Sequence, residues 1–158
     1  MMPFRWRYIA LPVFFLLLAI GLTIYFYPKL PGEVAYHFRD SLPDRWTGRG
    51  AATAWLLVPQ FLLTGLGVAI VMGVIRLGSR FQSTAGKRSE ALLLLMGNMV
   101  ALPQIVLVFA MLAIFSYNSY GLYLMPLWLF AIIAMGLGGI VLGALFFLAI
   151  QQALARKL

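Results

Sequence analysis

The feature that most constrains this chain is a set of four long apolar runs without a single charged residue. They cover residues 9–27, 51–75, 91–117 and 122–150. A helix needs about twenty apolar residues to cross a bilayer, so each run is long enough to span. Apolar residues make up 63% of the chain and charged residues only 10%, which is too few to cover a soluble domain of this size. The sequence predicts an all-α, integral membrane four-helix bundle that forms one membrane domain over residues 1–158.

The positions of Lys and Arg predict how this bundle is oriented. With four spans, the N-terminus, the basic loop 76–90 and the C-terminus share one side, and the loop 28–50 lies on the other. The first side carries Arg5, Arg7, Arg76, Arg80, Lys87, Arg88, Arg156 and Lys157, and the second carries Lys29, Arg39, Arg45 and Arg49. Cations near helix ends stay preferentially in the cytoplasm. We therefore expect both termini to be cytoplasmic, with their cations against anionic lipid headgroups and the loop 28–50 outside.

Three amides are the main polar side chains predicted to lie within the spans, namely Gln60, Asn98 and Gln104. They either tie helices together by hydrogen bonds or line a polar pocket for a lipid headgroup, a quinone or a peptide. No ionisable residue lies in the middle of a span, and ion-coupled transport usually needs one. The spans therefore favour a structural role for the amides over a transport role.

Small residues recur at four-residue spacing on two of the predicted helices. The second helix carries Gly65, Ala69 and Gly73, and the fourth carries Gly139 and Gly143. Small residues at this spacing let helix backbones approach closely in a membrane. These faces are predicted to pack either inside the bundle or against another subunit, including a second copy of the chain.

Motifs for catalysis and cofactor binding are weak in this sequence. Residues 86–89 read Gly-Lys-Arg-Ser, but a phosphate-binding loop needs another glycine five positions earlier and Ser or Thr directly after the lysine. His37 has Glu33, Asp40 and Asp44 nearby, yet a metal site from one imidazole and scattered carboxylates would be unusual. The chain has no cysteine, and no spacing encodes a catalytic triad. We expect no enzyme activity, no cofactor, no metal and no nucleic-acid partner.

The loop 28–50 is the most informative polar segment. Pro31-Gly32 and Pro43-Asp44 are turn signals, and between them residues 34–38 are rich in β-branched and aromatic side chains. We expect an ordered loop anchored by the rings of Tyr36, Phe38 and Trp46. His37 and Asp44 are then either a hydrogen-bonded pair that holds the loop or the polar part of a binding surface.

The same loop resembles a known family. Its pattern is Tyr-x-x-Leu-Pro, then His-Phe, then Pro-Asp-x-Trp, formed by Tyr27, Leu30, Pro31, His37, Phe38, Pro43, Asp44 and Trp46. This pattern after a first membrane helix resembles the domain of unknown function that begins the SdpI-type proteins, bacterial membrane proteins named for immunity to a sporulation-delaying peptide toxin. Ala35 stands where that family usually has proline, and the interval from His-Phe to Pro-Asp is one residue shorter. The resemblance covers about the first 60 residues and implies a multi-pass protein of a bacterial cytoplasmic membrane.

Three functions remain open at this point. The first is a non-enzymatic membrane protein, immunity- or signal-like, that binds or regulates a partner through its extracytoplasmic loop. The second is an accessory subunit of a larger membrane complex that uses a small-residue face as its seam. The third is a small transporter or channel.

Overall fold

The computed structural model describes residues 4–39, 42–80 and 86–155. This part of the chain forms five α-helices, a two-stranded sheet and two short 3₁₀ helices. The 3₁₀ helices are Trp6–Ile9 and Tyr27–Lys29. The other elements are α1 Ala10–Phe26, β1 Glu33–Arg39, β2 Leu42–Gly48, α2 Arg49–Arg80, α3 Gly86–Asn98, α4 Ala101–Tyr120 and α5 Leu127–Ala155.

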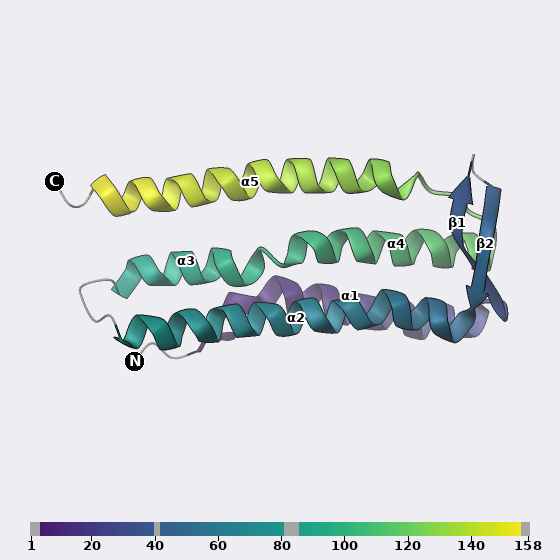
Figure 1. Ribbon diagram of the computed structural model, residues 1–158, viewed down its shortest axis with the longest axis horizontal. Helices are drawn as coiled ribbons and strands as arrows, with labels where there is room; N and C mark the ends of the chain where they lie inside the picture. Colours follow the sequence, from purple (N-terminus) through teal and green to yellow (C-terminus); the bar gives the residue numbers. More distant parts are fainter. Residues whose placement is uncertain (1–3, 40–41, 81–85, 156–158) are drawn as a thin grey trace.

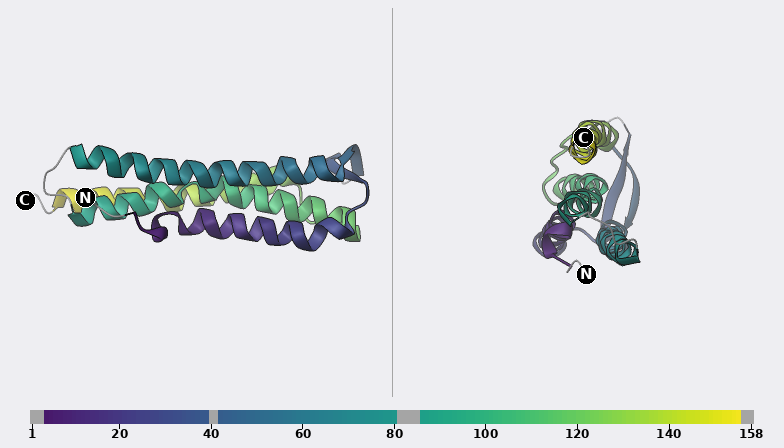
Figure 2. Two further views of the ribbon diagram at one scale, coloured as in Figure 1. Left: turned by 90° about the horizontal axis from the view of Figure 1, so that it is seen from below. Right: turned by 90° about the vertical axis from the view of Figure 1, so that its left-hand side faces the viewer.

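The helices run along one long axis and form three rows. The helices α3 and α4 follow each other in the middle row, with α1 and α2 on one side and α5 on the other (Figure 1). The antiparallel hairpin of β1 and β2 covers one end, which we call the hairpin end. The chain enters and leaves at the opposite end, which we call the basic end because Arg5, Arg7 and Arg76 lie there (Figure 2).

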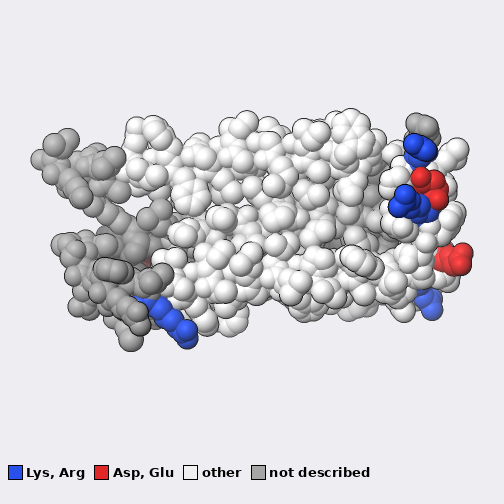
Figure 3. Space-filling model, viewed as in Figure 1, with Lys and Arg blue, Asp and Glu red and all other residues white. Residues whose placement is uncertain are grey.

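Four helical segments are long and apolar enough to cross a membrane, as the sequence predicts. They are Trp6–Lys29, Arg49–Arg76, Leu93–Tyr120 and Leu127–Gln151. On the face seen in Figure 3, the described charged side chains gather at the two ends, and the surface between them carries none. Such a belt is what hydrocarbon requires, because a charge at the bilayer centre costs several kcal/mol.

The element boundaries correct the sequence predictions in several places. The second helix covers Arg49–Arg80 and α3 begins at Gly86, so much of the predicted loop 76–90 is helical. The third span consists of two helices, because the chain leaves the helix at Met99 and Val100. The third and fourth runs were expected to end at residue 117 and to begin at residue 122, whereas α4 continues to Tyr120 and residues 121–126 connect it to α5. Finally, the fold is not purely helical, because the loop 28–50 contains two strands.

The break between α3 and α4 is occupied by polar contacts with the start of the chain. Asn98 accepts a hydrogen bond from the backbone N–H of Leu11 at 2.9 Å and donates to the carbonyl of Arg7 at 3.1 Å. Gly97 lies against the carbonyl oxygen of Tyr8, and an added Cβ at Gly97 would overlap that oxygen. Because Pro12 has no N–H to bond the Tyr8 carbonyl one turn earlier, this close approach covers an acceptor that the helix itself leaves free.

Buried Gln60 and Gln104 join α1, α2 and α4 in the membrane interior. Gln60 Nε2 donates to the backbone carbonyl of Gln104 at 3.2 Å. Gln104 Nε2 donates to Thr64 Oγ1 at 3.0 Å and to the carbonyls of Pro12 and Gln60 at 3.3 Å each. Both glutamines are fully buried. These hydrogen bonds tie helices together, as one of the two alternatives for the amides requires, while the Oε1 atoms of both glutamines have no partner among the described residues. We call this arrangement the glutamine network.

The predicted small-residue faces do not pack inside the bundle. At Gly65, Gly73, Gly139 and Gly143 an added Cβ would meet no described atom within 4 Å, and Ala69 is exposed. The close helix approaches occur at other glycines, which are Gly67, Gly97 and Gly138. Of the two predicted roles for the small-residue faces, packing within the bundle is therefore wrong, and packing against another subunit stays a prediction.

Candidate functional site

The hairpin β1–β2 is the part of the molecule that carries the residues singled out in the sequence. Its strands pair antiparallel from Glu33 opposite Gly48 to Arg39 opposite Leu42. Two register shifts interrupt the ladder and leave Tyr36 and Asp44 without a partner across the strands. A β-bulge changes the direction of the side chain of the extra, unpaired residue. The side chains of Tyr36 and Asp44 therefore need not follow the regular alternation of the strands.

The hairpin is attached to α4 by the side chain of Asn118. Asn118 Oδ1 accepts a hydrogen bond from the backbone N–H of Ala35 at 2.8 Å, and its Nδ2 donates to the carbonyl of Ala35 at 2.9 Å. The amide also donates to the carbonyl of Ile114 on its own helix, which fixes its orientation. One side chain thus pairs with strand β1 as a neighbouring strand would. The sequence does not reveal this role, since nothing local to Asn118 indicates a contact 83 residues away.

Apolar contacts complete the attachment of the hairpin. Leu30 and Val34 are buried in a core with Phe26 and Phe115. The Phe38 ring packs edge-on against Tyr117, with 4.7 Å between ring centroids, and against Tyr123 at 5.9 Å. Leu30 and Phe38 therefore have a loop-structuring role. Loop structuring and partner binding are the two roles that the motif residues could have.

The remaining motif residues take different positions. His37 Nδ1 donates to Asp44 Oδ1 at 2.5 Å, and both side chains are partly exposed. This hydrogen bond holds the pKa of the Asp44 carboxyl below its ordinary value, although partial desolvation acts in the other direction. The guanidinium carbon of Arg49 lies over the Tyr27 ring, 4.8 Å from the ring centroid. Pro31 is exposed, and Pro43 is half-buried opposite Phe38 in the ladder.

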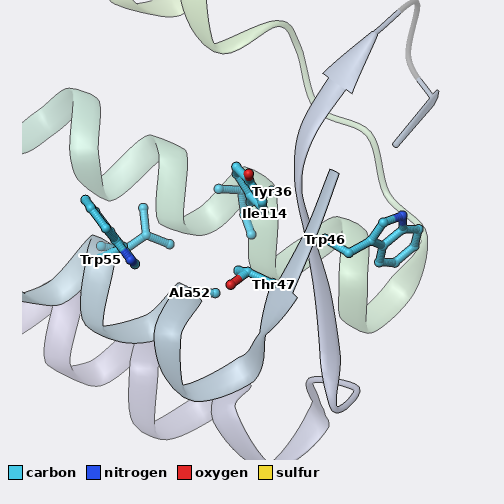
Figure 4. Close-up of a pocket in the computed structure, with 7 residues that line it drawn as sticks. Tyr36, Trp46, Thr47, Ala52, Trp55 and Ile114 are labelled. Atoms are coloured by element: carbon cyan, nitrogen blue, oxygen red, sulfur yellow. The ribbon is translucent and has the colours of Figure 1, made fainter. Parts of the chain in front are cut away.

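Three large apolar side chains of the hairpin remain open to the surroundings. Leu42 is 69% exposed, Trp46 is 53% exposed and Tyr36 is 43% exposed. In Figure 4 the Trp46 ring lies on the other side of the strands from Tyr36, which lies next to Ile114, and Trp46 also lines the first of the two cavities described next. A hairpin that is fixed at its base and exposes apolar side chains on its outer face is suited to bind another molecule.

Two cavities lie beneath the hairpin and meet at Tyr36 and Ile114. The first has a volume of about 430 Å³ and is lined mainly by β2 and α2, including Thr47, Ala52 and Trp55 (Figure 4). The second has a volume of about 650 Å³ and lies between β1, α4 and the start of α5. Both volumes fall within the range of small-molecule sites.

The described residues offer no obvious place for a metal ion. Among them, no three His, Cys, Asp or Glu side chains lie close enough to share one. Asp40, which the sequence analysis grouped with His37, lies outside the described residues. Of the polar side chains on the described part of the hairpin, those of His37 and Asp44 are joined to each other by a hydrogen bond.

The spans and the hairpin together define a multi-pass helical membrane protein. Residues 14–59 match the family model of a domain of unknown function (DUF1648). The matched segment contains most of α1, the whole hairpin and the first part of α2, so it includes all eight motif residues. The comparisons with curated proteins and with solved structures gave no match.

Proposed function

We propose that this protein is a non-enzymatic, multi-pass protein of a bacterial-type cytoplasmic membrane that binds a partner through the hairpin β1–β2 on the outer side. The observation that supports this proposal most directly is the pairing of exposed apolar side chains with a fixed base. Trp46 and Leu42 are exposed, while Asn118 attaches the same hairpin to α4. A surface that is ordered before binding loses little conformational entropy when it binds.

The distribution of cations supports the proposed orientation. In the sequence, eight Lys and Arg residues lie before the first span, between the second and third spans and after the fourth span, against four between the first and second spans. The membrane potential and anionic lipids favour cations on the cytoplasmic side. The resemblance to SdpI-type proteins adds an expectation of an immunity- or signal-like role, in which the partner would reach the hairpin from outside the cell.

The test is site-specific photo-crosslinking in cells. A photoreactive amino acid at position 46 should form a discrete adduct with the partner, whereas one at position 6 should not, since Trp6 is 74% exposed at the basic end. Trp46→Ala should abolish partner binding at normal protein abundance, and Trp6→Ala should leave it unchanged. Equal binding by the Trp46→Ala variant and the unmodified protein would refute the proposal.

A second candidate function is that of an accessory subunit in a larger membrane complex. Its support is the outward direction of Gly65, Gly73, Gly139 and Gly143, which leaves two small-residue faces without a partner among the described residues. Native mass measurement after gentle detergent extraction separates the two candidates. A stoichiometric complex that Gly139→Leu and Gly65→Leu disrupt would favour the subunit, and a monomer would exclude it.

A further inference from the structure

The two cavities beneath the hairpin share Tyr36 and Ile114 in their linings, and we call the two cavities together the lateral groove. Its floor on α4 consists largely of small and aliphatic residues, including Val106, Ala110, Ala113 and Ile114. One wall is α2 and the other is the segment that leads into α5, while the hairpin covers the end (Figure 2). The groove exists because alanines face the space between two helices that do not close over α4.

The position of the groove selects a ligand from the bilayer rather than from water. Its floor on α4 and its walls on α2 and α5 belong to the candidate spans, whereas residues 36–38 and 123–126 of its lining lie just outside them, so the groove lies at the hairpin end of the spans. Trp55 and Trp128 mark its two sides and are 79% and 65% exposed. Exposed tryptophan in membrane helices lies preferentially at the depth of the headgroups. The groove therefore runs from headgroup depth into the hydrocarbon, as a lipid molecule does.

The charges near the groove suit a phosphate. Arg39 and Arg45 are exposed on the hairpin strands, next to Phe38 and opposite His37, which both line the groove. The nearby carboxylate of Asp44 is already hydrogen-bonded to His37. Arg39 and Arg45 line neither cavity but belong to the strands that border them. Arginine binds phosphate oxygens through paired N–H donors, so these two exposed cations complement the phosphate of a lipid at the edge of the groove.

We propose that the lateral groove holds one acyl chain of a bilayer phospholipid, with the phosphate of that lipid beside Arg39 and Arg45. The acyl chain lies against Val106, Ala110 and Ala113 in the second cavity, which Trp46 does not line, so this site and the partner surface at Trp46 are tested at different residues. The lipid fills space between α2 and α5 that no described side chain fills. Its removal would leave the hairpin supported mainly by Asn118 and the core under β1.

The experiment uses the full chain in vesicles of phosphatidylglycerol and phosphatidylethanolamine that contain a phospholipid with a photoreactive diazirine in one acyl chain. After illumination, mass spectrometry of the digested protein locates the adducts, which should concentrate on residues 106–114 of α4. Ala113→Phe fills the groove and should lower these adducts about tenfold, corresponding to about 1.4 kcal/mol of lost lipid affinity. Ala54→Phe is the matched control, because Ala54 is exposed on α2 and does not line the groove, so its adducts should equal those of the unmodified protein.

A second pair of variants tests the headgroup. Replacing Arg39 and Arg45 by Gln should reduce adducts from an anionic phospholipid probe, whereas replacing both by Lys should retain most of them, since Lys keeps the charge. Ala113→Leu serves as the milder filling variant if Ala113→Phe lowers the unfolding temperature.

Three results would overturn the proposal. The first is an equal adduct yield on residues 106–114 in the Ala113 and Ala54 variants. The second is adducts spread evenly over α4 and the outward face of α5, which indicates ordinary surrounding lipid. The third is a protein segment crosslinked into the groove in place of lipid. Partner crosslinking at position 46 is scored separately, so either proposal can fail while the other stands.

Discussion

The three helices α1, α2 and α4 and the single helix α5 are all apolar enough to span a membrane, yet they are held in different ways. The first three share the glutamine network and a buried core beneath the hairpin. In α5, no residue of its most apolar 18-residue window is buried, compared with 44% in the window of the third span. Its contacts with α4 are apolar, such as the stacked rings of Phe109 and Phe130 at 3.8 Å.

This difference indicates which helices are held together by specific contacts and which helix is held more weakly. Lipid is as apolar as leucine, so burying leucine between helices contributes little in a bilayer, and hydrogen bonds and close packing decide which helices associate. The set α1–α2–α4 has both. The helix α5 has mainly packing, and the lateral groove lies where this weaker association begins.

The largest expected effect comes from crowding the tightest contact. Gly97→Leu would overlap the Tyr8 carbonyl and Val71, and should lower the free energy of unfolding by about 3 kcal/mol. Gly139→Leu is the matched control and should change stability by about 0.5 kcal/mol at most, because its Cβ position is open. Denaturant unfolding in detergent micelles measures both variants. Equal losses in the two would show that the contact at Gly97 does not matter.

The next effect concerns the attachment of the hairpin. Asn118→Leu leaves the N–H and the carbonyl of Ala35 without their partner and should cost about 1–3 kcal/mol. Hydrogen exchange at the Ala35 amide should accelerate, while exchange within α1 should not change. Ser119→Ala is the control, since the buried Ser119 hydroxyl has no partner among the described residues. A protected Ala35 amide in Asn118→Leu would contradict the assigned role.

Removing one member of the glutamine network should have a moderate effect. Gln104→Leu deletes the donors to Thr64 and to two carbonyls, and should cost about 1–2 kcal/mol. Distances between spin labels should increase between α1 and α4 and remain constant between α4 and α5. A change in the α4–α5 distance alone would indicate that Gln104 holds α5 and not the set α1, α2 and α4.

The contact of α5 should be weaker. A double-mutant cycle of Phe109→Leu and Phe130→Leu is expected to give a coupling energy of about 1 kcal/mol, as for other aromatic pairs. Unfolding measurements on the two single variants and the double variant provide this value. A coupling energy larger than the loss of stability measured for Gln104→Leu would indicate that α5 is as firmly held as the other helices.

The smallest effect should come from acid. Because the folded pKa of Asp44 is lowered, its bond to His37 stabilises the hairpin above the unfolded pKa, and this contribution is lost as the pH falls through the lower folded value. Trp46 fluorescence should therefore change below about pH 4, near the ordinary Asp pKa. The variant Asp44→Asn should lack this transition. An identical acid transition in both proteins would assign it to another group.

Much of the helical architecture was predictable from the sequence, because a bilayer imposes length and polarity on each span. The break at Met99 and Val100 was not, since it depends on Asn98 binding the backbone of residues 7 and 11. The strand β1 was not predicted as a strand, although its aromatic and β-branched residues are typical of strands and led to the expectation of an ordered loop. Its partner β2 was missed because Pro43, Asp44 and Gly48 are uncommon in strands and pair here only across the hairpin.

Among the hairpin contacts, those within the loop were predictable and those with distant segments were not. Motif spacing brought His37 and Asp44 together correctly as one of two alternatives, since both lie within a single short loop. It could not reveal Asn118 or the lateral groove, which depend on contacts between distant segments. Local chemistry was therefore predictable here, and tertiary attachment was not.

The alanine at position 35 determines how freely the hairpin can turn. Two hydrogen bonds to one amide define a plane, so strand β1 cannot rotate against α4 without breaking at least one of them. Proline, which the resembled family usually has at this position, carries no N–H and could keep only the bond through its carbonyl. In a chain with proline at this position, the hairpin could rotate about one remaining hydrogen bond. In this chain, two hydrogen bonds fix the orientation of the hairpin relative to α4.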